Sequence, residues 1–401
     1  MTSELTRRIL FTLGALLVFR LGTFIPLPGI SPSFWEQIFR SQADSTLGMA
    51  NLLSGGAIHR LAIFALGLVP YISAAVLLQL LPIISKRLRA LRTQGERGRR
   101  TIDLLTRSLT ALLSLLQAYG IAMGLEGVPG LVAEPGWLFR TTTVLTLTGG
   151  VMALVWLSDW ITARGVGNGV TLILFAGIVA EVPAGIAAIL EFGRSGFFSG
   201  GMILALLGSA FAFTSLIVAV ERARRRLPIV HIQRAGSDPH WHLPLKLNSA
   251  GVIPAILASW ILFVPLSIVD WVKPEYSGGL LADNGPLVLT AYAILIVGCT
   301  FFYTAYLVDP DAAAEILMRQ SALIEGISPG EPTAEHIDGV VTRLTMIGAI
   351  YLALVYVVPA VMIGAARLPF YFGGASLLIV VCAILDLEAH IRAFASVKTG
   401  G

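Results

Sequence analysis

Long apolar segments limit what this chain can fold into more than any other feature of its sequence. Ten of them approach the length of about 20 residues that a helix needs to cross a bilayer, and short polar segments separate them. In lipid, a helix satisfies its backbone hydrogen bonds internally. We therefore predict an all-α, polytopic membrane protein with ten transmembrane helices, at about 9–27, 61–84, 104–125, 141–163, 170–190, 200–220, 249–271, 287–308, 344–363 and 370–388.

The composition excludes most other classes of protein. Of the 401 residues, 56% belong to the set AVILMFWYC and 13% are charged, whereas soluble domains have about 25% charged residues. Cys299 and Cys382 both lie in apolar segments, so we do not expect a disulfide scaffold. Arg7 and Arg8 precede a full-length apolar segment that has no small-residue cleavage site, so we expect the first helix to remain in the protein.

Lysine and arginine are distributed unevenly between the two ends of the predicted helices. With a cytoplasmic N-terminus, 21 of the 28 basic residues fall on the cytoplasmic side and six on the other, while Arg20 lies within the first helix. Basic residues near helix ends are retained in the cytoplasm. We therefore expect both termini to be cytoplasmic, and we attribute the net charge of +4 to topology rather than to nucleic-acid binding.

Ten helices divide into two sets of five. Because five is odd, a structural repeat of the first set in the second must be inverted relative to the membrane, around a central path. We expect an N-terminal half at 1–190 and a C-terminal half at 191–401, with cytoplasmic loops at about 221–248 and 309–343. The segment 28–60 contains a Gly-rich stretch too short to span; it suits either a re-entrant element or an amphipathic turn on the outer surface.

Few ionisable side chains lie deep inside the predicted helices. Arg20 is the deepest, and Asp159, Glu181 and Asp270 fall near predicted helix ends. An arginine within a membrane either has a specific partner or plays a structural role, bonding helix-end carbonyls or extending to the interface. These residues form no chain that could relay protons, which argues against an ion-coupled pump.

The motifs of common catalytic sites are absent from the sequence. It contains no HExxH, GxSxG or GxxxxGK[ST], so we expect no enzymatic activity and no cofactor. His231, His240 and His242 lie close together without a cysteine or a carboxylate cluster, so we expect no metal site. A secondary transporter with inverted repeats remains an alternative function, although it would require coordinating polar groups at the membrane midplane.

Uncharged polar side chains do occur within the predicted helices. Ser73, Gln117 and Asn248 are examples. Hydrogen bonds between neighbouring transmembrane helices contribute about 0.6–2 kcal/mol each, which is weak enough to be exchanged. Such contacts suit a helix interface that opens, or equally a permanent one.

Several conspicuous sequence blocks follow one another along nearly the whole chain. They are FRLGTFIPLPG (19–29), LSGGA (53–57), PYISA (70–74), RGVGNG (164–169), HLPLKLN (242–248), AGVIPAI (250–256), FFYT (301–304) and PFYFGG (369–374). This ordered set resembles the SecY family, the large subunits of bacterial protein-export channels. The resemblance runs from about residue 7 to about residue 388.

The resemblance implies a channel that passes unfolded secretory polypeptides across the bacterial inner membrane and releases membrane segments laterally into the bilayer. In this family the pore is an hourglass whose waist is a ring of aliphatic side chains. Such a ring disfavours a continuous water column and offers no hydrogen bond to a passing polypeptide. The matching positions are Ile72, Val76, Leu174, Ile178, Ile256 and Ile379.

Two movable parts are also implied by the resemblance. The segment at about 45–60 resembles the plug that fills the outer funnel of an idle channel. Its matching residues are Asn51, Leu52, Leu53, Ser54, Gly55 and Gly56. Ser73, Gln117 and Asn248 match a polar cluster at the lateral gate, where a bound signal sequence would shift the equilibrium between closed and open states.

The partners implied by the resemblance are the small subunits SecE and SecG, and the motor ATPase SecA or a translating ribosome, including its RNA. The expected docking residues are Arg222, Arg224, Arg225, Arg226 and Arg234. The loop 309–343 departs from the family pattern: it holds seven acidic residues against Arg319 and Arg343, and Ser328 replaces a typical arginine. An accessory channel with restricted clients is therefore a further alternative.

Overall fold

The computed structural model divides into two compact units. Unit 1 comprises Met1–Ile203, Leu368–Phe372 and Ile379–Gly401, and unit 2 comprises Leu204–Arg367 and Gly373–Leu378. The division by five-helix halves stays a prediction. The structure describes residues 2–32, 34–36, 39, 51–85, 88, 90, 91, 94–231, 241–259, 261, 262, 285–366 and 373–396.

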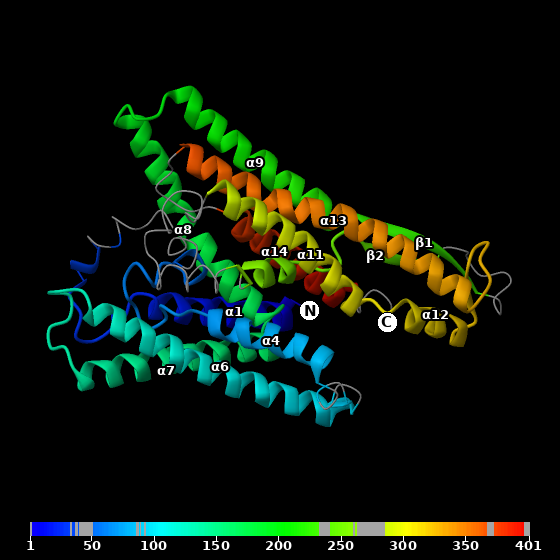
Figure 1. Cartoon of the computed structure of the whole chain (residues 1–401), viewed down its shortest axis with the longest axis horizontal. Coiled ribbons are helices and arrows are strands. Elements are labelled where there is room, and N and C mark those ends of the chain that lie inside the picture. Colours follow the sequence, from blue (N-terminus) through cyan, green and yellow to red (C-terminus); the bar gives the residue numbers. More distant parts are fainter. Residues whose placement is uncertain are drawn as a thin grey trace. The chain divides into compact units, whose positions relative to one another are not determined.

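Unit 1 is built from long helices that pack along one another (Figure 1). In it, α6 packs against both α4 and α7, and α1 contacts α7 and α8. The helices are α1 (Thr2–Gly22), α4 (Val69–Ile84), α6 (Gly95–Glu126), α7 (Trp137–Arg164), α8 (Gly169–Arg194) and the part of α14 (Gly374–Ser396) from Ile379 onward.

Several helix boundaries differ from the predicted ones for local reasons. The helix expected at 61–84 begins at Val69, because Leu61 and Gly67 have positive φ angles of 43° and 56° and turn the chain. The α8 helix begins where Asn168 caps it, with its side-chain oxygen accepting from the amides of Val170 at 3.0 Å and Thr171 at 3.4 Å.

Unit 2 contains α9 (Gly200–Arg222) from Leu204 onward, α11 (Pro286–Leu307) and α13 (Glu331–Ala366). The α11 and α13 helices pack against each other. Residues 253–259, 261 and 262 are also helical, and the rest of the span predicted at 249–271 lies largely outside the described residues.

A small antiparallel sheet joins the two segments that we expected to be cytoplasmic loops. Its order is β2-β1-β3, formed by β1 (Arg224–His231), β2 (Trp241–Lys246) and β3 (Ala322–Ile324). The sheet and α12 (Pro310–Arg319) share a hydrophobic core with the start of α13. The buried side chains of that core are Leu227, Ile229, Leu317, Ala322, Ile324, Ile337, Val340 and Leu344.

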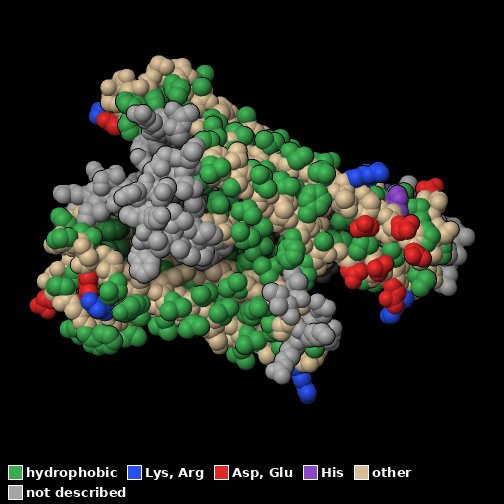
Figure 2. Space-filling view, in the orientation of Figure 1, with side chains coloured by type: hydrophobic (Ala, Val, Ile, Leu, Met, Phe, Trp, Pro, Cys, Tyr) green, Lys and Arg blue, Asp and Glu red, His purple; other side chains and the backbone are tan. Residues whose placement is uncertain are grey.

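The described helices have the length and composition of membrane spans. Seven of them are long and apolar enough to cross a bilayer, and Val69–Pro82 forms a shorter apolar helix. Hydrophobic side chains cover much of the helical surface in Figure 2, whereas acidic side chains gather over the end of unit 2 that holds α12. Asp311 and Glu315 of α12 and Glu335 in the first turns of α13 are exposed.

Candidate functional site

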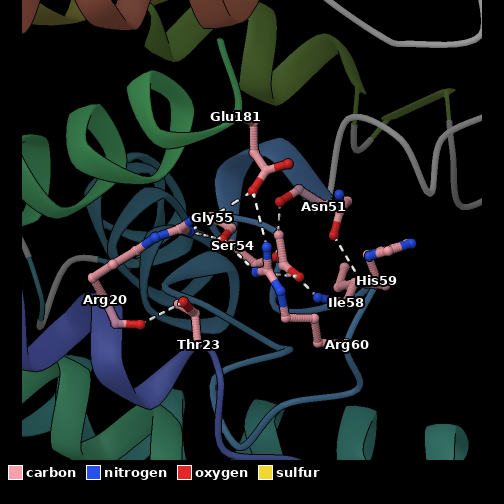
Figure 3. A network of polar contacts seen from close by, with 10 residues as sticks. Arg20, Thr23, Asn51, Ser54, Gly55, Ile58, His59, Arg60 and Glu181 are labelled. Atoms are coloured by element: carbon pink, nitrogen blue, oxygen red, sulfur yellow. Dashed lines mark hydrogen bonds and ion pairs between the residues drawn. The ribbon is translucent and has the colours of Figure 1, made fainter. Parts of the chain in front are cut away.

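The residues predicted to form the plug make a tight Gly-Gly turn in unit 1. Gly55 and Gly56 have φ angles of +70° and +78°, a backbone conformation that residues other than glycine rarely adopt. The Gly56 amide donates to the Asn51 carbonyl at 2.9 Å. The Asn51 side-chain oxygen accepts from the His59 amide at 2.8 Å, and the Ser54 hydroxyl donates to the Asn51 carbonyl at 3.0 Å (Figure 3). The turn is therefore closed by its own hydrogen bonds.

This turn lies directly against the backbone of α8. A Cβ atom added to Gly55 would lie 3.1 Å from Gly177 Cα and 3.2 Å from the Phe19 ring. A Cβ added to Gly177 would in turn lie 3.1 Å from the Gly55 nitrogen. Both glycines are thus required for the backbone of the turn to approach that of the helix.

Two arginines donate hydrogen bonds to the carbonyl oxygens of the turn. Arg20 Nη1, on α1, donates to the Gly55 oxygen at 2.6 Å. Arg60 Nη1 donates to the Gly56 oxygen at 3.2 Å and to the Gly55 oxygen at 3.5 Å. Of the two alternatives left open for Arg20, the structure shows elements of both: the side chain bonds a carbonyl of this turn and lies beside a carboxylate.

Glu181 of α8 lies beside both guanidinium groups. Its Oε1 atom is 3.7 Å from Arg20 Nη1 and 3.8 Å from Arg60 Nη2, and its side chain is 17% exposed. The sequence analysis placed Glu181 near a helix end, which was wrong: it lies in the middle of α8. The Phe24 ring contacts both arginines, with Cζ-to-centroid distances of 4.9 Å and 4.2 Å.

Burial and charge act on Arg60 in opposite directions. Burial lowers the pKa of the Arg60 guanidinium, the Glu181 carboxylate raises it, and the Arg20 charge lowers it again. The net direction is downward, but arginine pKa values lie so high that the group keeps its proton. The turn is therefore held by two positive charges and one negative charge.

The six aliphatic residues predicted for the pore ring are all partly or fully buried. Ile72 and Ile256 are half-buried, and the other four have exposures below 10%. Five of them, Ile72, Val76, Leu174, Ile178 and Ile379, belong to unit 1, and Ile256 belongs to unit 2. Their arrangement as a ring stays a prediction.

The predicted gate residues are likewise divided between the units. Ser73 is buried on α4 and its hydroxyl donates to the Val69 carbonyl at 2.7 Å. Gln117 is half-buried on α6, which packs against α4. Asn248 is buried in unit 2. Their gathering at a lateral gate stays a prediction.

Asn248 takes part in a polar network that the sequence analysis missed. Its Nδ2 donates to Glu221 Oε1 at 2.9 Å, and its Oδ1 accepts from the Gly251 amide at 3.0 Å. The Tyr351 hydroxyl donates to the same Glu221 oxygen at 3.3 Å. These contacts connect the end of α9, the approach to the helical residues 253–259, and α13.

We expect Asn248→Ala to lower the thermal unfolding midpoint of the purified protein. The change removes a donor to a carboxylate, and hydrogen bonds to charged groups contribute about 1.5–3 kcal/mol. Ser249→Ala is the matched control, because it removes a neutral hydrogen bond, at 3.0 Å to the Lys246 carbonyl, from the next residue. Equal midpoints for the two variants, measured by intrinsic fluorescence on heating, would contradict this role for Asn248.

The predicted docking arginines lie at the start of the small sheet. Arg222 ends α9, and Arg224, Arg225 and Arg226 are exposed on β1. In the register of the sheet, Arg224 lies opposite Lys246 of β2, so like charges face each other across the strands. Arg234 lies outside the described residues.

The described histidines and cysteines do not form a metal site. No set of three or more His, Cys, Asp or Glu side chains there could hold a metal ion. His242 is exposed on β2, whereas His240 lies outside the described residues. Cys299 and Cys382, the two cysteines of the chain, are not joined in a disulfide.

Comparison with known proteins identifies relatives along nearly the whole chain. The SecY family model matches residues 62–387. The protein translocase subunit SecY of Escherichia coli strain K12 is 43% identical over 408 residues, which cover 97% of this chain and 91% of that protein. The protein translocase subunit SecY of Pseudomonas aeruginosa is 42% identical over 405 residues, with the same coverage.

Solved structures share the fold. A protein-conducting channel matches with a TM-score of 0.68 at 16% identity, and Sec61 in a canine ribosome–channel complex matches with a TM-score of 0.66 at 15% identity. Each match covers 97% of this chain and 92% of the other. The polytopic, mostly helical fold predicted from the sequence is confirmed. With a family match over most of its length and relatives above 40% identity, the chain belongs to the SecY family.

Proposed function

We propose that this chain is the channel-forming subunit of a protein translocase, and that unfolded secretory polypeptides cross the bacterial inner membrane through it. The observation that carries this proposal is the 43% identity, over nearly its whole length, to a protein translocase subunit SecY. The relatives do not support the secondary transporter considered as an alternative.

The aliphatic residues form the narrow part of the pore in this proposal. Ile72 and Val76 are four residues apart on α4, and Leu174 and Ile178 are four apart on α8, so each pair lies on one face of its helix. Aliphatic groups offer a polypeptide no hydrogen bond, so chains of any sequence slide past. When the pore is empty, they disfavour a continuous water column and so limit ion flow.

The Gly-Gly turn closes the idle channel in this proposal. Small residues allow the turn to pack against α8 without interlocking side chains, so it can leave without disrupting a large packed surface. Ser73, Gln117 and Asn248 belong to the seam through which membrane segments are released. Signal sequences open this seam by binding the open state more tightly than the closed one.

Energy for transport comes from partners, because the proposal assigns no catalytic residue to this chain. The exposed arginines of β1 suit contact with an acidic or phosphate-bearing partner, and we assign them to docking of SecA or a ribosome. SecE and SecG complete the channel. The predicted excess of basic residues on one side supports a cytoplasmic location for both termini.

Reconstitution tests the proposed function directly. Vesicles containing this chain with SecE, SecG and SecA are expected to protect a secretory precursor from added protease when ATP is present. Vesicles without this chain are the control. If precursor protection is equal with and without the chain, or if the chain alone supports counterflow of a small solute, the proposal is wrong.

A further inference from the structure

We infer that Glu181 is a positioning residue that holds Arg20 and Arg60 together on the Gly55–Gly56 turn. Its charge thereby sets how readily the turn leaves α8. The inference rests on the proposed function, in which this turn closes the idle channel. It concerns what regulates that closure.

The two arginines converge on the same carbonyl oxygen. Arg20 donates to the Gly55 oxygen at 2.6 Å, and Arg60 reaches the same atom at 3.5 Å while donating to the Gly56 oxygen at 3.2 Å. Figure 3 shows the two guanidinium groups approaching the turn from different parts of the chain. Their side chains are 31% and 28% exposed, so water only partly screens the repulsion between them.

Glu181 offsets this repulsion through its charge rather than through a hydrogen bond. Its Oε1 atom is buried and has no hydrogen-bond partner among the described residues, yet it lies within 4 Å of a nitrogen of each arginine. A carboxylate in the middle of an apolar helix is costly unless charges of opposite sign accompany it. The position of Glu181 is therefore explained by the arginine pair.

The tip of the turn meets α8 through its backbone. Gly55 and Gly177 meet backbone to backbone, so no side chain of either residue interlocks with the other. The contacts of Arg20, Arg60 and Glu181 therefore add side-chain interactions to a junction that is backbone to backbone at Gly55 and Gly177. Removal of the carboxylate leaves two like charges on one turn, which favours separation of the arginines and departure of the turn.

The test is the ion conductance of resting channels in planar bilayers, formed from the complete complex without precursor. Glu181→Gln keeps the shape of the side chain and removes the charge. We expect it to raise the resting conductance about fivefold or more, within the range typical of coupling between sites. Glu181→Asp, which keeps the charge, is expected to restore most of the closure.

Glu191→Gln is the matched control on the same helix. Glu191 pairs with Arg194 at 3.0 Å on an exposed surface, where the side chains are 63% and 82% exposed. This variant is expected to conduct like the unmodified channel. Equal resting conductance for Glu181→Gln and Glu191→Gln would overturn the inference.

A double variant separates charge balance from general loosening. The resting conductance is measured for Glu181→Gln, for Arg60→Gln and for the variant with both changes. If Glu181 acts by offsetting the arginines, Arg60→Gln removes the repulsion that Glu181→Gln exposes. The fold-increase of the double variant is then smaller than the product of the two single fold-increases. Multiplying effects would overturn the inference. Precursor transport is measured in parallel, with the same complexes reconstituted in vesicles. Absence of transport by the unmodified complex refutes the proposed function. Normal transport together with an unchanged resting conductance of Glu181→Gln refutes only the inference.

Discussion

A channel in which Ile72 and Ile256 are both replaced by glycine is expected to conduct ions at rest about tenfold more than the unmodified channel. This corresponds to a free-energy barrier to ion flow that is lower by ~1.4 kcal/mol. Each substitution removes an aliphatic side chain from the proposed narrow part of the pore. A wider and less apolar constriction holds a continuous water column more easily. Single-channel recording in planar bilayers without precursor measures the change.

Glycine also weakens a helix, so this prediction needs controls with the same backbone cost. Leu77→Gly on α4 and Ile261→Gly beside the second site are suitable, because these side chains are 47% and 51% exposed and glycine costs a helix about 1 kcal/mol at either position. The controls are expected to leave the resting conductance unchanged. A similar rise in the controls would refute the assignment of Ile72 and Ile256 to the constriction.

Replacing Arg225 and Arg226 by glutamate is expected to slow ATP-driven precursor transport roughly tenfold. The new carboxylates would face the acidic or phosphate-bearing surface of the proposed partner, and like charges opposed across an interface cost several kcal/mol. Both side chains are exposed on β1, next to the buried Leu227 that anchors the strand in its core. The resting ion conductance is expected to stay unchanged, since neither residue belongs to the proposed pore. Initial rates of precursor protection in vesicles measure the effect.

Basic residues also determine the orientation of membrane helices, so topology must be checked in the same variant. Labelling of single cysteines from each side of the membrane provides that check. Arg194→Glu is the control, because Arg194 is exposed and its predicted place is the opposite side of the membrane. Unchanged transport with normal topology would mean that Arg225 and Arg226 have no role in docking.

Hydropathy was sufficient to predict the helices but not the small sheet. Long apolar runs identify spans because lipid leaves few alternatives to a helix. By contrast, β1 is a charged segment interrupted by Pro228, and β3 has three residues. These strands form because Leu227 and Ile229 share a core with residues about 90 to 120 positions later in the chain. Such pairing depends on tertiary contacts and leaves no periodic signal in either segment.

The candidate site was predictable in its parts and not in its connections. The Gly-Gly pair and the submerged Arg20 are visible in the sequence, because glycine and a charge in an apolar run are both exceptional. The role of Glu181 was missed because 126 residues, from Gly55 to Glu181, separate it in sequence from the turn. The polar network around Asn248 was missed for the same reason, since Glu221 lies 27 residues from Asn248 and 130 residues from Tyr351.

Photocrosslinking from α8 tests most directly the claim that translocating polypeptides pass the aliphatic side chains. A photoreactive group at position 178 replaces a fully buried isoleucine, whereas one at position 179 replaces a valine that is 39% exposed at nearly the same depth. With a secretory chain stalled in the channel, we predict strong crosslinking from position 178 and weak crosslinking from position 179. Equal crosslinking, or stronger crosslinking from position 179, would contradict the proposed path.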